Sequence, residues 1–381
     1  MTVSEIEIRP IETKQEWDDF IGLPWKIYQD NPNWIPPLRI AIKDMLDVDK
    51  NPFFRHAFMH PCIAYRNGEP VGRVVGVIDD NHNRFHQEKT AFFGFFEVEN
   101  NQVTTNRLFD EIAKWAKSKG MTTLRGPVNL STNHECGLLI EGYDSAPMVM
   151  MTYNPPYYQN LLDQWGLKKS KDLLAYQVKY DAKFADVIYT HAEKLKKTAD
   201  VTFRTVNMKK FDSEVEKFLD VYNDAWEANW GFVPMEPYEF RHMAKEMKMI
   251  VDPRIILIAE VRGQMAGFGL TLPDVNQVLK HIQDGKLFPI GLLKLLWNLK
   301  GPGRKKINQC RVLTLGIKKA YRDLGLGALF YVEYIKRGPA CGYKTGEASW
   351  ILEDNIPMNR ALERMCGERT KVYRIFDRAL N

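Results

Sequence analysis

The sequence predicts an α/β protein with a mixed α+β sheet, arranged as two similar halves. Length is the first reason, because 381 residues exceed the usual size of one domain. Hydrophobic residues make up 45% of the chain, which is enough for a sizeable core. Short apolar strands and helical stretches alternate along the chain, and their order occurs twice.

The repeat is visible as matching blocks that lie about 200 residues apart. Residues 62–73 (CIAYRNGEPVGR) and 257–268 (LIAEVRGQMAGF) both predict a hairpin around a glycine turn. Residues 154–166 (NPPYYQNLLDQWG) likewise match 355–367 (NIPMNRALERMCG). A period this long indicates a duplicated domain and not a solenoid. We therefore expect one domain over 1–178, a second over 198–381, and a helical connector over 181–200.

The individual elements follow from hydrophobic periodicity and turn residues. In the first half, apolar residues at helical spacing predict a core helix over 106–119 that ends before Gly120. The second half gives the clearest set of elements. We expect strands near 201–206, 255–261, 265–272, 310–317, 344–351 and 370–377, and helices near 212–228, 236–248, 325–337 and 356–365.

Composition excludes several classes of protein. The net charge of +5 is too small to indicate nucleic-acid binding, although it suits an anionic ligand. The five cysteines are scattered and form no CxxC pair, so we expect neither a disulfide framework nor a metal site. The first residues lack a basic, apolar leader, and no stretch reaches the roughly 18 apolar residues of a membrane span. We expect a cytoplasmic protein, with the inner membrane face as an alternative location.

A glycine-containing turn in the second half predicts an anion site. Residues 319–330 (KAYRDLGLGALF) join the strand ending near 317 to a largely apolar helix. Each glycine costs roughly 0.5–1 kcal/mol relative to alanine inside a helix, and Gly325 and Gly327 fall two residues apart. Bare backbone at a helix N-terminus lets unpaired N–H groups surround a phosphate, which the helix dipole also favours.

This turn resembles a motif of a known family. Arg322-x-x-Gly325-x-Gly327-Ala328 after the strand VLTLGIK is similar to the acyl-CoA pyrophosphate loop of the GNAT superfamily of N-acyltransferases. The resemblance covers both halves in layout, but the glycine loop occurs only in the second half. It implies that acetyl-CoA or a longer acyl-CoA is the co-substrate and that an acceptor amine attacks directly. The residues that it implies for cofactor binding are Leu315, Gly316, Ile317, Arg322, Leu324, Gly325, Leu326, Gly327, Ala328 and Asn355.

The sequence offers several candidates for the catalytic acid and base. The tyrosine that many GNAT enzymes carry four residues before the glycine after the last helix is Glu363 here. Tyr373 is an alternative acid, although a strand tyrosine is commonly structural. Three carboxylates lie in or just after the strand beside the expected thioester, namely Glu347, Glu353 and Asp354. Glu347 is the first choice of base because it lies within the strand.

The first half has no RxxGxG motif, and Glu97 and Glu99 stand where a phosphate would be needed, so we expect no CoA binding there. It carries instead a long polar and apolar loop over 125–158. We interpret this loop as a wall of the acceptor site, with packing between domains as the alternative. The adjacent His134, Glu135 and Cys136 do not favour a metal site. The expected acceptor contacts are Asn133, Glu135, Tyr153 and Asn154.

An apolar insertion with basic flanks occupies residues 275–306, and a helix is expected between Pro289 and Gly301. Three interpretations stay open: peripheral membrane contact through 287–306, a cover for a long acyl chain, or a plain lid helix. The leading function is transfer of an acyl group from acyl-CoA to a small-molecule or lipid amine, with no nucleic-acid partner. The alternatives are a protein like the aminoacyl-tRNA-dependent peptidyltransferases and a non-catalytic acyl-CoA or lipid-binding module.

Overall fold

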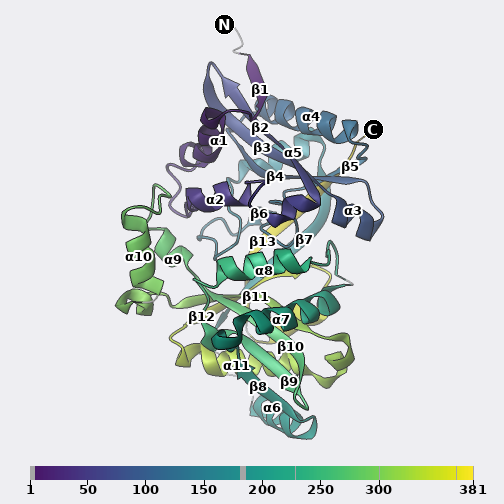
Figure 1. The fold of residues 1–381 in the computed structure, drawn as a ribbon, viewed down its shortest axis with the longest axis vertical. Helices are drawn as coiled ribbons and strands as arrows, with labels where there is room; N and C mark the ends of the chain where they lie inside the picture. Colours follow the sequence, from purple (N-terminus) through teal and green to yellow (C-terminus); the bar gives the residue numbers. More distant parts are fainter. Residues whose placement is uncertain (1–4, 181–185, 228, 300, 366, 381) are drawn as a thin grey trace. The chain divides into compact units, whose positions relative to one another are not determined.

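The chain folds into two compact units. The computed structural model describes residues 5–180, 186–227, 229–299, 301–365 and 367–380 (Figure 1). Unit 1 contains residues 1–173, 282–291 and 371–381, and unit 2 contains residues 174–281 and 292–370. Most of the C-terminal strand, from residue 371 onward, therefore belongs to unit 1. The expected roles of 1–178 as the acceptor side and 198–381 as the CoA-binding domain stay predictions.

Unit 1 is built on a sheet in which four antiparallel strands lead to one parallel pair. Strands β1 (Ile6–Pro10), β2 (Ala57–Arg66), β3 (Glu69–Asp79) and β4 (Thr90–Val98) pair in sequence order. Strand β5 (Thr123–Gly126) lies parallel to β4. Strand β13 (Glu368–Ala379) then pairs with β5 and with β6 (Leu138–Glu141), in both cases antiparallel.

Helices cover both faces of the unit 1 sheet because strand residues alternate between the faces. On one face, Gly72 and Gly76 of β3 contact Leu108 and Trp115 of α4 (Gln102–Ser118). On the other face, Arg73 donates a hydrogen bond to the carbonyl of Phe20 in α1 (Lys14–Ile27). The other helices of this part of the chain are α2 (Arg39–Met45), α3 (Asp80–His86) and α5 (Tyr157–Trp165).

Unit 2 repeats the strand order of unit 1. Strands β8 (Val201–Thr205), β9 (Leu257–Val261), β10 (Gln264–Pro273) and β11 (Gln309–Ile317) pair antiparallel in sequence order. Strand β12 (Thr345–Leu352) lies parallel to β11, and β7 (Lys168–Lys179) lies beside β12. Each unit thus has four antiparallel strands followed by one parallel pair.

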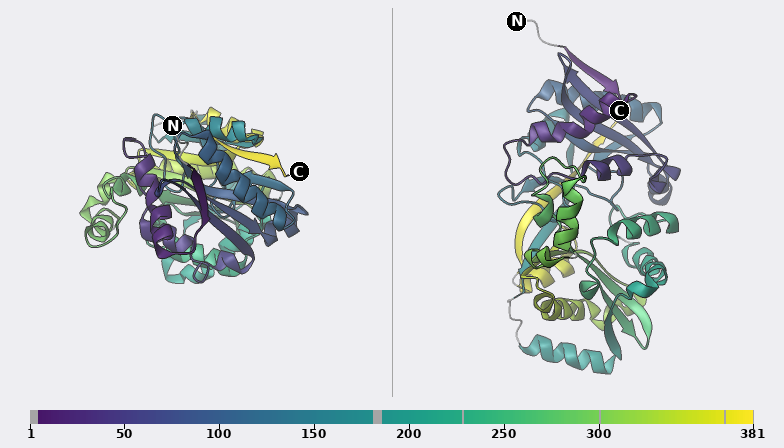
Figure 2. Two further views of the ribbon diagram at one scale, coloured as in Figure 1. Left: turned by 90° about the horizontal axis from the view of Figure 1, so that it is seen from above. Right: turned by 60° about the vertical axis from the view of Figure 1, so that its left-hand side comes forward.

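Two helices of unit 2, α6 (Asp186–Thr198) and α11 (Leu326–Ala340), pack against each other. Figure 2 shows α6 beside α11, and Ala192 packs there against Leu326 and Leu329. The other α-helices are α7 (Phe211–Trp226), α8 (Pro237–Met247), α9 (Asn276–Leu279), α10 (Ile290–Leu299) and α12 (Ile356–Arg364). Short 3-10 helices occur at η1 (Pro52–Arg55), η2 (Met208–Lys210), η3 (Pro253–Ile255), η4 (Pro302–Lys306) and η5 (Lys319–Leu324).

The element order expected from the sequence is confirmed. All six strands and all four helices predicted for the second half are present, with ends shifted by at most a few residues. Part of the expected connector forms α6, while residues 181–185 of that stretch lie outside the described residues. Among the described helices, none is both long enough and apolar enough to cross a bilayer.

Candidate active site

The site in unit 2 begins where two parallel strands separate. Strand β11 pairs with β12 from Gln309 to Val312, whose partner is Ala348. Beyond Val312, β11 continues to Ile317, paired only with β10 in the described part of the chain. A cavity of about 1140 Å³ opens in this gap, and residues 312–317 of β11 form one of its walls. The strand edge in the gap is free to pair with an extended ligand.

The glycine turn lies at one end of this cavity. Gly325 ends η5 and precedes α11 in the left-handed conformation, with φ +69°, which favours glycine because other side chains are strained there. Gly327 has no such requirement, because an added Cβ would meet nothing closer than the Ile317 Cδ1 atom at 3.9 Å. Packing therefore does not explain Gly327, and its role in holding a ligand stays a prediction. The first N–H groups of a helix have no acceptor one turn earlier in that helix. In α11 the Ala328 N–H donates to the Gly325 carbonyl at 3.2 Å, so Leu326 and Gly327 provide the first N–H groups that a ligand could use.

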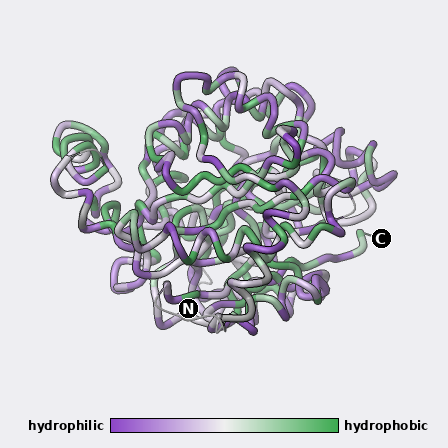
Figure 3. The backbone as a smooth tube through the Cα atoms, turned by 90° about the horizontal axis from the view of Figure 1, so that it is seen from below, coloured by the Kyte–Doolittle hydropathy of each residue, from purple (hydrophilic) through white to green (hydrophobic). Residues whose placement is uncertain are grey.

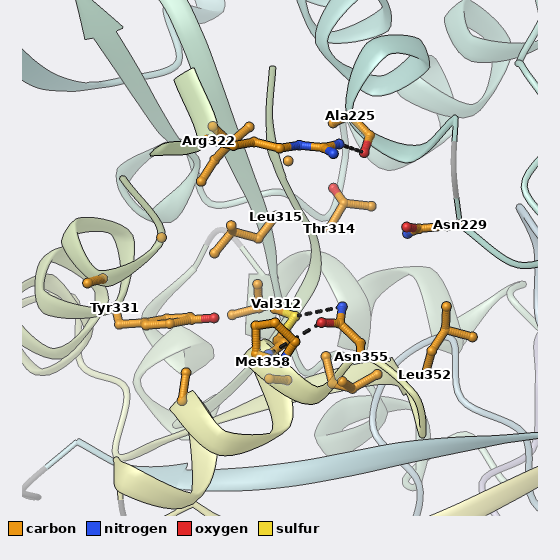
Figure 4. Close-up of a pocket in the computed structure, with 18 of the residues that line it drawn as sticks. Ala225, Asn229, Val312, Thr314, Leu315, Arg322, Tyr331, Leu352, Asn355 and Met358 are labelled. Carbon is orange, nitrogen blue, oxygen red and sulfur yellow. Dashed lines mark hydrogen bonds between the residues drawn. The ribbon is translucent and has the colours of Figure 1, made fainter. Parts of the chain in front are cut away.

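Two arginines bring positive charge to the cavity wall. Arg322 lies in η5, and its guanidinium donates a 2.6 Å hydrogen bond to the carbonyl of Ala225 at the end of α7 (Figure 4). Arg364 at the end of α12 also lines the cavity. Together with the N-terminus of α11, these side chains suit a ligand with several negative charges.

The N-terminus of α12 forms the opposite wall. Asn355 is the N-cap of this helix, and its side-chain oxygen accepts a hydrogen bond from the Met358 N–H at 3.3 Å (Figure 4). The predicted cofactor-binding residue Asn355 thus lines the cavity and also has a clear structural role.

Tyr331 is the cavity-lining phenol of unit 2. It lies one turn into α11, and its hydroxyl points into the cavity (Figure 4). Burial raises the pKa of Tyr331 to about 12, so the phenol stays protonated at neutral pH and can act as a hydrogen-bond donor.

The three predicted catalytic residues lie in different surroundings. Glu347 is buried on β12, and its carboxylate accepts a 2.7 Å hydrogen bond from the Ser349 hydroxyl. Ser349 lines the cavity and in turn accepts from the Arg311 Nε atom at 2.9 Å. Glu347 is therefore one hydrogen bond away from the cavity wall.

The other two predicted catalytic residues, Glu353 and Tyr373, are not among the cavity-lining residues that the structure describes. Among the described residues that line the cavity, Asp354 and Asn355 are present but neighbouring Glu353 is not. Tyr373 is completely buried on β13, in the part of the chain that belongs to unit 1. The catalytic roles of Glu347, Glu353 and Tyr373 stay predictions.

The equivalent gap in unit 1 is filled by the protein itself. Strand β4 pairs with β5 only from Thr90 to Phe92. Beyond this point the loop after β5 takes the place of a second strand, because the Val128 N–H donates to the Phe93 carbonyl at 2.7 Å. The Asn129 side chain then accepts from the Phe95 N–H, also at 2.7 Å. An added Cβ at Gly94 would lie 2.1 Å from the Val128 carbonyl oxygen, so glycine permits this close contact.

Glu97 of β4 and Glu99, which follows the strand, do not face an open phosphate site. Glu97, whose side chain is 14% exposed, accepts hydrogen bonds from Tyr28 and Tyr158, both at 2.8 Å. Glu99 forms an ion pair with Arg66. Their roles in the fold explain them without a ligand.

The predicted acceptor residues all belong to the loop region of unit 1. Asn154 is buried, and its side chain accepts from the Leu139 N–H at 2.7 Å and donates to the Leu139 carbonyl at 3.1 Å. The Tyr153 hydroxyl donates to the Tyr143 carbonyl at 2.9 Å. The backbone carbonyl of Glu135 accepts from Asn129, and the Asn133 N–H donates to Ser131. These contacts stabilise the loop, and the acceptor role of the four residues stays a prediction.

Sequence reasoning did not single out several of the cavity residues, among them Trp226, Tyr331 and Arg364. Tyr331 had a usable signal, because it falls four residues after Gly327, about one helical turn along the same helix. Trp226 and Arg364 come from helices far away in the sequence, so nothing local connects them to the glycine turn. In the described part of the chain, no group of three or more acidic, histidine or cysteine side chains is arranged to hold a metal ion.

Comparison with known proteins gives two full-length relatives, although no family model matches the chain. The chain is 34% identical over 384 residues to the bacterial ceramide synthase of Caulobacter vibrioides, covering 100% of this chain and 99% of the relative. It is also 34% identical over 379 residues to protein YghO of Escherichia coli, covering 98% and 95%.

Solved structures give the fold. A tandem GNAT protein from the clavulanic acid biosynthesis pathway matches with a TM-score of 0.57 and 12% identity over 99% of both chains. A GCN5-related N-acetyltransferase from Sphaerobacter thermophilus matches with a TM-score of 0.55 and 10% identity over 99% of this chain and 96% of that one. The chain belongs to the same family as bacterial ceramide synthase and YghO, and it is an acyltransferase with the tandem GNAT fold.

Proposed function

We propose that this acyltransferase moves a long acyl group from acyl-CoA to the amine of a lipid-like acceptor, and that unit 2 carries the reaction. The open gap between β11 and β12, which ends at the bare start of α11, is the observation that carries this proposal. It provides a strand edge, an anion site and a large cavity in one continuous space.

The residues of the gap fit acyl-CoA. The N–H groups from Leu324 to Gly327 would hold the pyrophosphate, with Arg322 and Arg364 as its cationic neighbours. The free edge of β11 at residues 315–317 would pair with the amide groups of the pantetheine arm. When bound, acyl-CoA supplies an activated acyl group as a thioester.

The cavity walls favour a long acyl chain over an acetyl group. The volume of the cavity, about 1140 Å³, exceeds the roughly 300–1,000 Å³ of a typical small-molecule pocket. Apolar side chains from four elements line it: Trp226, Leu313, Leu315, Ile351, Leu352, Met358 and Met365. A ceramide is an N-acylated long-chain amino alcohol, so the name of the Caulobacter relative supports an acceptor of this chemical class.

The protein residues would assist the transfer at three points. Backbone N–H groups of β11 beyond Val312 would donate to the carbonyl oxygen as it becomes negative. Glu347 would take the amine proton through the Ser349 hydroxyl, which already donates to it. Tyr331 would donate a hydrogen bond to the sulfur as the carbon–sulfur bond breaks and the carbon–nitrogen bond forms.

The test is a transfer assay with two substrate series. Purified full-length protein is incubated with acyl-CoA thioesters from acetyl to palmitoyl, and with either a long-chain amino alcohol or a short amine such as glucosamine. We expect release of the CoA thiol together with an amide product, seen by mass spectrometry, only for the long-chain amine and most rapidly for long acyl chains. Ethanolamine, which keeps the amino alcohol but lacks the chain, is the matched control acceptor.

Transfer to glucosamine or ethanolamine at a similar rate would show that the acceptor is not lipid-like. Thiol release without an amide product would show hydrolysis and contradict amine acylation.

A further inference from the structure

Exposed hydrophobic side chains gather on one short segment of the chain. Twelve large hydrophobic residues are exposed in the described part of the protein, and five of them lie between positions 288 and 297. We call these five residues the α10 surface: Phe288, Ile290, Leu293, Leu296 and Trp297, which are 65%, 61%, 67%, 42% and 58% exposed. Figure 3 colours hydrophobic residues green, and the coil of α10 contains such green stretches.

The five residues form a continuous patch because of helical spacing. Ile290, Leu293 and Trp297 follow each other at three and four residues, so they lie on one face of α10, with Leu296 beside them. The opposite side of the helix is covered, since Gly291 is buried and Leu295 and Leu299 are half-buried. One side of α10 is therefore packed against the protein, and the side that carries the α10 surface is exposed.

The charged residues in the stretch of chain around this patch are mainly basic. Residues 280–306 contain seven lysine or arginine residues and a single acidic residue, Asp284. Lys286 and Lys306, on either side of the helix, are both exposed. Lys294 on α10 is also exposed and donates to the His281 carbonyl at 2.9 Å. An apolar face with Trp and Phe, flanked by basic residues, has the composition of helices that lie in a membrane interface.

We propose that the α10 surface docks this protein on the anionic face of a lipid bilayer. The apolar side chains enter the boundary between headgroups and acyl chains, and the flanking lysines contact anionic headgroups. A second protein chain is a poorer fit, because protein interfaces are depleted in lysine around their apolar core. The proposal goes beyond acyl transfer and holds whatever amine is the acceptor.

The experiment is vesicle flotation of the full-length protein. Vesicles of phosphatidylcholine with phosphatidylglycerol are compared with vesicles of phosphatidylcholine alone. We expect binding to the anionic vesicles that weakens as salt rises. The double variant Leu293→Glu, Trp297→Glu should lose binding by at least about tenfold, because it places two charges in the apolar face. Lys286→Glu with Lys306→Glu should lower binding by about fivefold or more per lysine at low salt.

Matched controls separate the patch from hydrophobicity in general. Met249→Glu and Val103→Glu change residues that are 62% and 60% exposed elsewhere on the protein, and they should bind vesicles like the wild type. Failure of the wild type to float with anionic vesicles at low salt would overturn the proposal. So would self-association, measured by light scattering, that the double variant abolishes while vesicle binding is unchanged. Thermal unfolding of each variant checks that the fold is kept.

Discussion

The two units share one strand order, but the gap beside the parallel strand pair is filled by protein in unit 1 and open in unit 2. In unit 1 the chain runs through residues 127–156 between β5 and α5, and this long loop returns to pair with β4. In unit 2 only residues 353–355 separate β12 from α12, so nothing returns to β11. The longer loop of unit 1 thus fills the gap that the short connection of unit 2 leaves open.

The same comparison applies to single positions on the fifth strand of each repeat. Thr123 of β5 pairs with Thr90, as Thr345 of β12 pairs with Gln309. Two residues later, unit 1 has Arg125, which forms ion pairs with Glu88 and Asp377. Unit 2 has Glu347 at that place, linked through Ser349 to the cavity. A structural ion pair in one repeat therefore corresponds to the proposed base in the other.

The comparison is tested most directly by placing a negative charge at the start of α11 in unit 2 and of α4, the equivalent helix, in unit 1. Gly327→Glu places a carboxylate among the first N–H groups of α11, where an added Cβ has room. We expect acyl-CoA affinity, measured by calorimetry, to fall at least about 100-fold because of repulsion and bulk, with little change in thermal stability. Gly325→Glu is the poorer test, since the left-handed backbone at Gly325 strains any other residue.

Val103→Glu is the matched control, because Val103 is exposed in the first turn of α4, the equivalent helix of unit 1. It should leave acyl-CoA affinity unchanged. A loss of affinity in Val103→Glu and none in Gly327→Glu would move the site to the other unit.

The next largest effect concerns the proposed base. Glu347→Gln keeps an acceptor for the Ser349 hydroxyl but cannot take a proton. We expect kcat to fall about 100-fold, with an unchanged KM for acyl-CoA, because proton removal and not binding is affected. Ser349→Ala should have a similar effect if the hydroxyl carries the proton. Full activity in Glu347→Gln would exclude this carboxylate and leave Asp354, which lines the cavity directly.

Much of the fold could be predicted because it depends on local patterns. Glycine turns and alternating apolar residues were sufficient for the hairpin β9–β10, and helical spacing for α11 and α12. The duplication could be read from matching blocks. The position of β13 in the sheet could not be predicted, because the sequence of a strand does not specify which neighbouring strand it pairs with.

The candidate site was predictable where backbone chemistry dictates the residue. Gly325 and Gly327 could be found because bare backbone in that position needs a reason. The wall residues Trp226 and Arg364 could not, since only the tertiary fold brings α7 and α12 to the cavity. The loop of unit 1 that fills the gap beside β4 could not be predicted either, because nothing in the sequence indicates that the Asn129 side chain accepts from the Phe95 N–H.

A smaller effect is expected at the cavity phenol. Tyr331→Phe removes one hydrogen-bond donor without a change in shape, so kcat should fall about tenfold at saturating acyl-CoA. The pKa of Tyr331, raised to about 12 by burial, keeps the hydroxyl protonated throughout the working range. The ratio of wild-type to variant kcat should therefore be the same at pH 7 and pH 9. A ratio that changes with pH would show that Tyr331 exchanges a proton during turnover.

The smallest effect on ligand binding should come from weakening the contact between β4 and the loop that fills the gap in unit 1. Asn129→Ala leaves the Phe95 N–H without its acceptor, which should lower the free energy of unfolding by about 1–2 kcal/mol. Acyl-CoA stoichiometry should stay at one per chain, since the Val128 backbone still pairs with Phe93 and α4 still lacks the glycine turn of α11. Asn133→Ala, elsewhere in the same loop, is the control for stability. A second equivalent of bound acyl-CoA in Asn129→Ala would mean that the loop alone separates the two units in function, and that unit 1 keeps a concealed cofactor site.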